Sequence, residues 1–220
     1  NKESDSEIDF NGLGSSLIYL NDKVIFSIGT PTQDSNLIDS LAQNKNSFFG
    51  KILSIDIEEF SDSSIKPKIF SLGHRNPQGL TKHKDRIFSV EHGPKGGDEL
   101  NEIKFDKNYG WPLSSYGTRY SFHDDGKSYN INHEKNGFEE PLYAISPSVG
   151  ISAVNNCPTK LKNYFKKNCL LALSLHGNEL RTGKSLLVFL LDENFQAVHS
   201  FEKIFLNKKL VMRHFMTNKK

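Results

Sequence analysis

The chain has 220 residues, which is enough for one domain with a substantial core. Hydrophobic residues make up 36% and charged residues 25%, a composition that indicates a soluble globular protein. The 28 Lys and Arg are nearly matched by 26 Asp and Glu, and the resulting net charge of +2 argues against a nucleic-acid-binding footprint.

The two ends of the chain carry few structural signals. Residues 1–11 are polar and are expected to be a disordered lead, whereas residues 12–220 are expected to form a single domain. The basic C-terminal tail is interpreted as a solvated end. The longest apolar stretch, Leu186–Leu191, is far too short to cross a bilayer, and no signal peptide is visible. Because the chain starts with Asn1 rather than Met, we expect the true start to be missing.

Strand signals recur along the chain at a spacing of roughly ten residues. Leu17–Leu20 and Val24–Ile28 flank a polar turn at residues 21–23 and predict a hairpin. Further strands are predicted at Lys51–Ile57, Lys68–Leu72, Arg86–Val90, Leu100–Phe105, Cys169–Leu175, Ser185–Leu191 and Ala197–Phe205.

Helix signals are weak by comparison. Asn36–Gln43 has the pattern of two helical turns, and Leu161–Lys167 is interpreted as an irregular connector rather than a helix. Many short strands with almost no helix predict an all-β fold: a sandwich, a barrel or a propeller.

Two stretches of the chain share a hairpin plan. Leu17–Gly29 and Leu80–Gly93 each begin with an apolar run, turn at polar residues, and return through Ile-Phe-Ser and another aliphatic residue. A reused hairpin favours a propeller, whose blades repeat one unit, over the other all-β folds.

Cys157 and Cys169 are the two cysteines of the chain. They are not spaced as a zinc site. They can form one disulfide or remain two buried thiols, and we favour thiols because Cys169 opens an apolar run.

A glycine-rich loop follows the strand predicted at Arg86–Val90. Its sequence, from His92 to Glu99, is His-Gly-Pro-Lys-Gly-Gly-Asp-Glu. Glycines let such a loop turn several carbonyl oxygens toward one point, and the carbonyls with Asp98, Glu99 and the Tyr109 oxygen form a set suited to calcium. The spacing alone favours the more common case, a plain glycine turn with solvated acids, over a calcium site.

The preceding polar run, from His74 to Gln78, offers donors of three shapes. Arg75 can grip a carboxylate or a quinone oxygen through its guanidinium, or it can cap nearby carbonyls. A phosphate loop at Thr182–Ser185 is rejected, because the required earlier glycine is displaced and a strand rather than a helix follows. A phosphate-dependent hydrolase is therefore disfavoured.

Three long motifs stand in order along the chain: GHRNPQGL from Gly73, EHGPKGGDELNEI from Glu91, and NYGWP from Asn108. In this order and spacing they resemble the soluble PQQ-dependent glucose/sorbosone dehydrogenases, and most closely the bacterial aldose sugar dehydrogenases. The resemblance extends from about Leu17 to Leu191 and fades beyond.

The resemblance implies a six-bladed β-propeller with pyrroloquinoline quinone (PQQ) and calcium as cofactors. It implies that Arg75 contacts the reactive quinone oxygen as the catalytic arginine. The implied cofactor contacts are Asn76, Gln78, Ser148, His176 and Arg213. The implied calcium ligands are the backbone carbonyls of Gly93 and Pro94, with Glu99 and Tyr109 at a second site. Calcium and Arg75 would make the quinone a better hydride acceptor.

The chain departs from the family pattern at the catalytic base. The family has a histidine just before the strand that matches Leu17–Leu20, and an acid after the next strand. Here the first position reads Asn11-Gly12-Leu13-Gly14 and the second is Thr30. Neither Asn nor Gly can take a proton near neutral pH.

Length also separates the chain from a complete propeller. At about 40–45 residues per blade, six blades need about 240–270 residues, so we expect an incomplete propeller of about four blades.

The expected function is oxidation of an aldose sugar at C1 with transfer of electrons to an external acceptor, in the periplasm or outside the cell. The alternative is a non-catalytic propeller of the same family that binds calcium, sugar or a protein.

Overall fold

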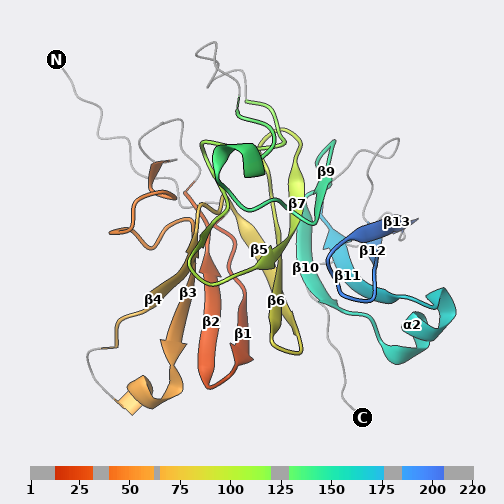
Figure 1. The fold of residues 1–220 in the computed structure, drawn as a ribbon, viewed down its shortest axis with the longest axis horizontal. Helices are drawn as coiled ribbons and strands as arrows, with labels where there is room; N and C mark the ends of the chain where they lie inside the picture. The colour runs from red at the N-terminus through yellow and green to blue at the C-terminus, as the bar shows by residue number, and fades with distance from the viewer. Residues whose placement is uncertain (1–12, 32–39, 62–64, 120–128, 176–184, 206–220) are drawn as a thin grey trace.

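The computed structural model describes residues 13–31, 40–61, 65–119, 129–175 and 185–205 (Figure 1). These residues form three largely antiparallel sheets and few helices, which confirms the predicted all-β class. No helix of the described part is long and apolar enough to cross a membrane.

The strands follow one another in sequence order within each sheet. The first sheet contains β1 (Leu17–Leu20), β2 (Lys23–Ile28), β3 (Lys51–Asp56) and β4 (Lys68–Leu72), with β8 (Lys107–Asn108) added parallel to β4. The second contains β5 (Pro77–His83), β6 (Arg86–Glu91), β7 (Asp98–Ile103) and β9 (Tyr143–Ile145). The third contains β10 (Ile151–Asn156), β11 (Asn168–Ser174), β12 (Ser185–Leu191) and β13 (Val198–Phe205). The helical segments are η1 (Ile57–Ser61), η3 (Glu134–Asn136) and α2 (Thr159–Phe165).

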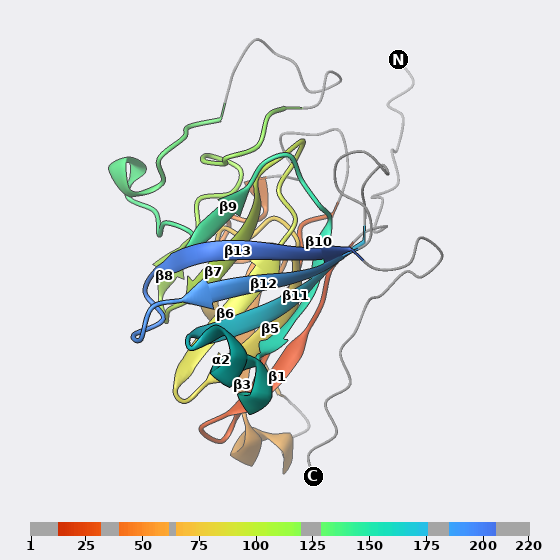
Figure 2. The same cartoon turned by 90° about the vertical axis from the view of Figure 1, so that its right-hand side faces the viewer.

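The first strands of the three sheets are neighbours in space. Strand β5 packs against β1 on one side and against β10 on the other, and Figures 1 and 2 show the sheets fanning outward from these strands. Consecutive four-stranded meanders whose first strands adjoin are the plan of propeller blades. The described residues contain three such sheets, and the predicted number of about four blades stays a prediction.

Side chains that alternate along the strands join the sheets. On β6, Ile87 belongs to the apolar cluster shared with the first sheet, whereas Phe88 and Val90 belong to the cluster shared with the third. The period of two places successive side chains on opposite faces. On β12, likewise, Phe189 faces the second sheet and Val188 faces α2.

The two Ile-Phe-Ser runs occupy equivalent places, because they form the second strands of the first two sheets. Ile25 and Ile87 lie in the same apolar cluster. The β1–β2 hairpin turns at Asn21 and Asp22, with φ of 49° and 56°. A two-residue turn with both φ values positive matches the twist of the flanking strands, and Asn and Asp tolerate it.

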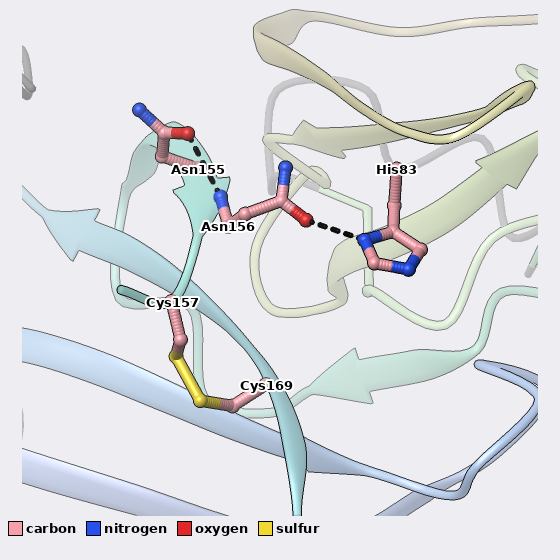
Figure 3. The surroundings of a disulfide bond; sticks show 5 residues. All are labelled: His83, Asn155, Asn156, Cys157 and Cys169. Carbon is pink, nitrogen blue, oxygen red and sulfur yellow. Dashed lines mark hydrogen bonds between the residues drawn. A yellow bond between two sulfur atoms is a disulfide. The ribbon is translucent and has the colours of Figure 1, made fainter. Parts of the chain in front are cut away.

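Two sequence predictions are wrong. The segment Leu161–Lys167, read as an irregular connector, lies largely in the helix α2, whose Leu161 and Phe165 pack on the outer side of the third sheet. Cys157 and Cys169, expected as thiols, form a disulfide (Figure 3). Cys157 directly follows β10 and Cys169 lies on the adjacent β11, with Cα atoms 5.4 Å apart, so the sheet itself brings the cysteines together.

Only part of the helix predicted at Asn36–Gln43 can be compared with the structure, because residues 36–39 lie outside the described residues. Its described end is turn-like, with the Gln43 amide donating to the carbonyl of Ser40.

Candidate cation and cofactor site

The loops that follow β4, β6 and β8 meet at one end of the sheets. This follows from the topology, because β8 runs parallel to β4 and the end of β6 adjoins the start of β5. The loops enclose a cavity of about 10 Å³, lined among others by Arg75, Gly93, Pro94, Glu99, Tyr109 and His133. A cavity of this size has room for one water or ion, whereas a tricyclic quinone would need contacts outside it.

Arg75 is held at the edge of this cavity by three groups. Its backbone amide donates to Glu91 Oε2 over 3.0 Å, and its Nη1 donates to the carbonyl of His92 over 3.1 Å. The guanidinium carbon lies 5.3 Å from the centre of the Trp111 ring. The structure therefore places Arg75 beside the Gly93–Pro94 bend, as a shared ligand requires.

Asp98 organises the glycine loop and is not free to bind a cation. Its Oδ1 accepts hydrogen bonds from the Gly93 amide and the Ser148 hydroxyl, and its Oδ2 accepts from the amides of Val149 and Ile151. Asp98, which the glycine-loop pattern placed in the predicted oxygen set, instead ties two loops together through its carboxylate. Ser148 Oγ also lies 3.3 Å from the Pro94 carbonyl.

Glu91 and Glu99 face each other directly across β6 and β7, and both are buried. Burial raises the pKa of Glu99 well above its ordinary value, the charge of Glu91 raises it further, and the hydrogen bond from Asn101 opposes both. Like charges directly opposite on paired strands destabilise a sheet unless a cation or proton compensates them. The pair therefore fits a hard cation.

The amide group of Asn101 lies between the two carboxylates. Its Nδ2 donates to Glu91 Oε1 and Glu99 Oε2, at 2.9 and 3.1 Å, which turns Oδ1 away from the carboxylates. Within the described residues Oδ1 is buried without a hydrogen-bond partner, as are Trp111 Nε1, His92 Nε2 and His133 Nδ1. Buried polar atoms without partners are costly, and His92, Trp111 and His133 all line the cavity, which indicates a ligand there that the protein chain does not supply.

Tyr109 can contribute only part of what the sequence suggests. Its hydroxyl donates to the carbonyl of Glu102 and accepts from the amide of Lys104, and its ring stacks on His74 with centroids 4.5 Å apart. Burial raises the pKa of the Tyr109 hydroxyl above its ordinary value. The hydroxyl is thus occupied within the sheet, and the atom of Tyr109 left to offer a cation is its backbone carbonyl.

His133 closes the cavity from the segment before η3. Its side chain is almost fully buried, its Nε2 lies 3.8 Å from Glu99 Oε1, and its ring stacks on Tyr116. Burial lowers the pKa of His133 and so favours the neutral imidazole. Within the described residues, however, no group of three or more His, Cys, Asp or Glu side chains is arranged to hold a metal ion, so any cation here depends on carbonyl and amide oxygens as well.

The remaining predicted site residues are not brought to this cavity. Asn76 Oδ1 accepts hydrogen bonds from the amide of Gly14 over 2.6 Å and from Gln78 Nε2. Both side chains therefore lie toward the segment that precedes β1. Their cofactor contacts stay predictions. His176 and Arg213 lie outside the described residues.

Thr30 stands where the resemblance predicts an acid, and its contacts are with the Arg75 loop. Its hydroxyl donates to the carbonyl of His74 over 2.9 Å, and its amide donates to the carbonyl of Arg75 over 2.7 Å. It therefore braces the Arg75 loop.

The sequence assigned site roles to the glycine loop and Arg75 but none to Glu91, Asn101 or His133, although Glu91 and Asn101 stand within the second motif. Glu99 and Asn101 stand two residues apart on one strand, so the period of two was a usable signal that they share a face. The partnership with Glu91 needs the strand register, which the sequence does not show.

The family model described as Glucose / Sorbosone dehydrogenase matches residues 3–208 of the chain. Among curated proteins, the chain is 38% identical over 124 residues to an uncharacterized protein of Synechocystis (strain PCC 6803), covering 49% of this chain and 30% of that protein. It is 35% identical over 99 residues to the aldose sugar dehydrogenase YliI of Escherichia coli, covering 42% and 25%. It is 33% identical over 90 residues to quinoprotein glucose dehydrogenase B of Acinetobacter calcoaceticus, covering 38% and 18%.

Solved structures with the same fold cover nearly all of the chain. A glucose dehydrogenase matches with a TM-score of 0.70 and 26% identity, over 92% of this chain and 56% of that one. The PQQ-bound aldose sugar dehydrogenase of Streptomyces coelicolor matches with a TM-score of 0.63 and 21% identity, over 91% and 51%. The chain thus spans about half of these structures, and the matched parts make up less than a third of the curated relatives.

Proposed function

The chain belongs to the Glucose / Sorbosone dehydrogenase family, and from this premise we propose that the protein is a PQQ- and calcium-dependent dehydrogenase that oxidises an aldose sugar at C1. The observation that carries the proposal is the convergence of Arg75, the Gly93–Pro94 bend and the buried Glu91–Glu99 pair on one cavity. The fold proposed with it is a six-bladed β-propeller, of which this chain supplies about four blades in the single domain 12–220.

Each group of the site has a proposed task. The carbonyls of Gly93 and Pro94 would hold one calcium ion, and Glu99 with the carbonyl of Tyr109 would hold a second, because hard cations prefer oxygen ligands. Arg75 and Trp111 Nε1 present hydrogen-bond donors on the same side, which suits an anionic quinone. PQQ, when bound, would supply the hydride acceptor. The Arg75 guanidinium would stabilise negative charge that develops on an oxygen beside it.

The base that accepts the proton of the sugar hydroxyl is the part of the mechanism with no assigned residue. Thr30 cannot serve, and Asn11 and Gly12 lie outside the described residues. This departure is what supports the alternative, a non-catalytic member of the family that binds calcium, sugar or a protein.

Reconstitution separates the two functions. The full-length protein is incubated with PQQ and calcium, and reduction of a redox dye is followed with glucose and other aldoses. Dye reduction that requires both cofactors supports the dehydrogenase, and the dye then stands in for the external electron acceptor. Saturable PQQ binding without turnover for any aldose contradicts it and favours the non-catalytic alternative.

Replacement of Arg75 tests the proposed chemistry. Arg75→Ala is expected to lower turnover about 100-fold or more, in the range seen when a preorganised charge-stabilising donor is removed. Lys82→Ala, which removes an exposed cation at the far end of β5, serves as the matched control and should retain activity. Unchanged turnover in Arg75→Ala removes this residue from the site.

We also propose a periplasmic or secreted location. The Cys157–Cys169 disulfide supports it, because such bonds form and persist in oxidising compartments and are rare in the cytosol.

A further inference from the structure

A buried hydrogen-bond chain lies directly behind Arg75. Glu91 Oε2 accepts the Arg75 amide, and Glu91 Oε1 lies 3.1 Å from His74 Nδ1. His74 Nε2 in turn lies 2.8 Å from Ser71 Oγ. The side chains of His74 and Glu91 are 0% and 5% exposed, so neither is open to substrate, and the chain acts through what it holds.

The proton positions in this chain follow from its chemistry. The His74 tautomer with its hydrogen on Nδ1 suits both contacts, because Nδ1 then donates to the Glu91 carboxyl and Nε2 accepts the Ser71 hydroxyl. The Tyr109 ring stacks on the His74 ring and restricts rotation of the imidazole. Every polar atom of the His74 ring is thus engaged.

The backbone around Arg75 is fixed from both sides. The Arg75 amide donates to Glu91, and its carbonyl accepts from the amide of Thr30. The His74 amide donates to the Gly50 carbonyl. Because the backbone is held, the Arg75 side chain leaves it in one direction. The guanidinium then donates to the His92 carbonyl and packs over the Trp111 ring.

We propose that Glu91 and His74 are positioning residues that set the direction of the Arg75 guanidinium toward the bound cofactor. The expected effect on cofactor binding rests on the proposed function. The hydrogen bonds that hold the Arg75 backbone do not depend on it. Neither residue touches the reacting atoms. A hydrogen bond to a buried charged acceptor is strong, and its loss leaves the donor, here the Arg75 amide, unsatisfied.

Glu91→Gln tests this hold with almost no change of shape. Both carboxyl oxygens lie beside nitrogen atoms, namely Asn101 Nδ2, His74 Nδ1 and the Arg75 amide, and the substitution removes the negative charge that strengthens the bond from the Arg75 amide. The matched control is Glu102→Gln on β7, whose carboxylate pairs with Arg86 away from the cavity.

The first measurement needs no cofactor. Amide hydrogen exchange of the cofactor-free protein is followed by NMR at Arg75. Glu91→Gln is expected to speed exchange of this amide about tenfold or more, with Glu102→Gln like wild type. Equal protection of the Arg75 amide in Glu91→Gln and wild type overturns the proposal.

His74 supplies the second pair of variants if Glu91→Gln fails to fold. His74→Phe keeps a ring to stack on Tyr109 but removes the donor to Glu91, whereas His74→Asn returns a donor close to the place of Nδ1. Faster Arg75 exchange in His74→Phe and recovery in His74→Asn support positioning by hydrogen bonding. Identical exchange in both variants contradicts it.

A double-mutant cycle on PQQ affinity then connects the hold to the site. Glu91→Gln should weaken PQQ binding about tenfold in the wild-type background and change it little in Arg75→Ala, because its effect passes through Arg75. Equal losses in both backgrounds indicate a general structural role and overturn the proposal. Absence of PQQ binding in the wild type contradicts the proposed function, while the exchange measurement still decides whether Arg75 is held.

Discussion

Glu91 and Glu99 show how the strand register turns ordinary residues into a site. Each is an unremarkable acid at a strand end in the sequence, yet the β6–β7 register sets them opposite each other in a buried position. The motif predicted Glu99, and no local pattern predicted its partner, because register depends on the turn between the strands and on the rest of the sheet.

Glu99→Ala is expected to weaken calcium binding about tenfold or more, because a charged oxygen ligand is lost. Isothermal titration calorimetry of calcium into the metal-free protein measures this, with Glu102→Ala as the control. Because the pKa of Glu99 is raised, protons should compete with calcium at a higher pH than for an ordinary carboxyl, so affinity should fall early on acidification. Equal affinity in Glu99→Ala and wild type contradicts the proposed oxygen cage.

The strands show which local signals suffice. The β1–β2 hairpin and β4 were predicted to within one residue, because apolar runs were bounded by strong turn residues. Strand β7 begins at Asp98 rather than Leu100, so the two acids are strand residues and not loop residues. Strands β9 and β10 were missed, since one has three residues and the other mixes Ser and Asn with its aliphatic positions.

The helix α2 was missed for a related reason. It has only seven residues, too few for a period of 3.6 to stand out, and it is supported by packing rather than by propensity. Leu161 and Phe165, four residues apart, meet the cluster that contains both cysteines. The helix therefore sits within the loop that the disulfide closes.

Removing that disulfide should cost about 2–4 kcal/mol of unfolding free energy, as expected for a link that closes a loop of this kind. The two cysteines are 12 positions apart in the sequence. Urea unfolding of the double variant Cys157→Ser and Cys169→Ser measures the loss. A reducing agent should shift the wild type to the same midpoint and leave the double variant unchanged. Equal midpoints for wild type and variant would contradict the expected contribution.

The second and third sheets are also joined at the end opposite the candidate site. His83 Nδ1 bonds Asn156 Oδ1 over 3.1 Å, and the His83 ring stacks on Phe195 (Figure 3 shows the first of these contacts). Arg86 reaches across the same boundary to the carbonyls of Asn194 and Phe195. Residue patterns predicted most of the strands. They could not predict these contacts between sheets, which depend on how the blades pack together.

This junction should make stability depend on pH. Burial lowers the pKa of His83 from its ordinary 6.5, and the cations of Lys162, Lys84 and Arg86 lower it further, while the bond to Asn156 opposes them. The unfolded chain then binds the proton more readily, so stability present above about pH 6.5 is lost as the pH falls below it. Melting temperatures at pH 7 and pH 5.5 should fall more for wild type than for His83→Gln. A parallel fall in both proteins would contradict the role of His83.

Lys51 offers a way to observe motion in this molecule. Its ammonium lies fully inside, donating to the carbonyls of Leu41, Ala42 and Phe49, and burial lowers its pKa to about 8. Such an amine is chemically ready for acylation yet walled off from reagents. Mass spectrometry after pulsed labelling should find Lys51 modified far more slowly than the exposed Lys45. The rate of modification should equal the rate at which residues 41–49 open locally and expose the amine. The labelling rate of Lys51 would thus report local opening of residues 41–49, a segment whose Ala42 carbonyl accepts the amide of Gly73 beside the Arg75 loop.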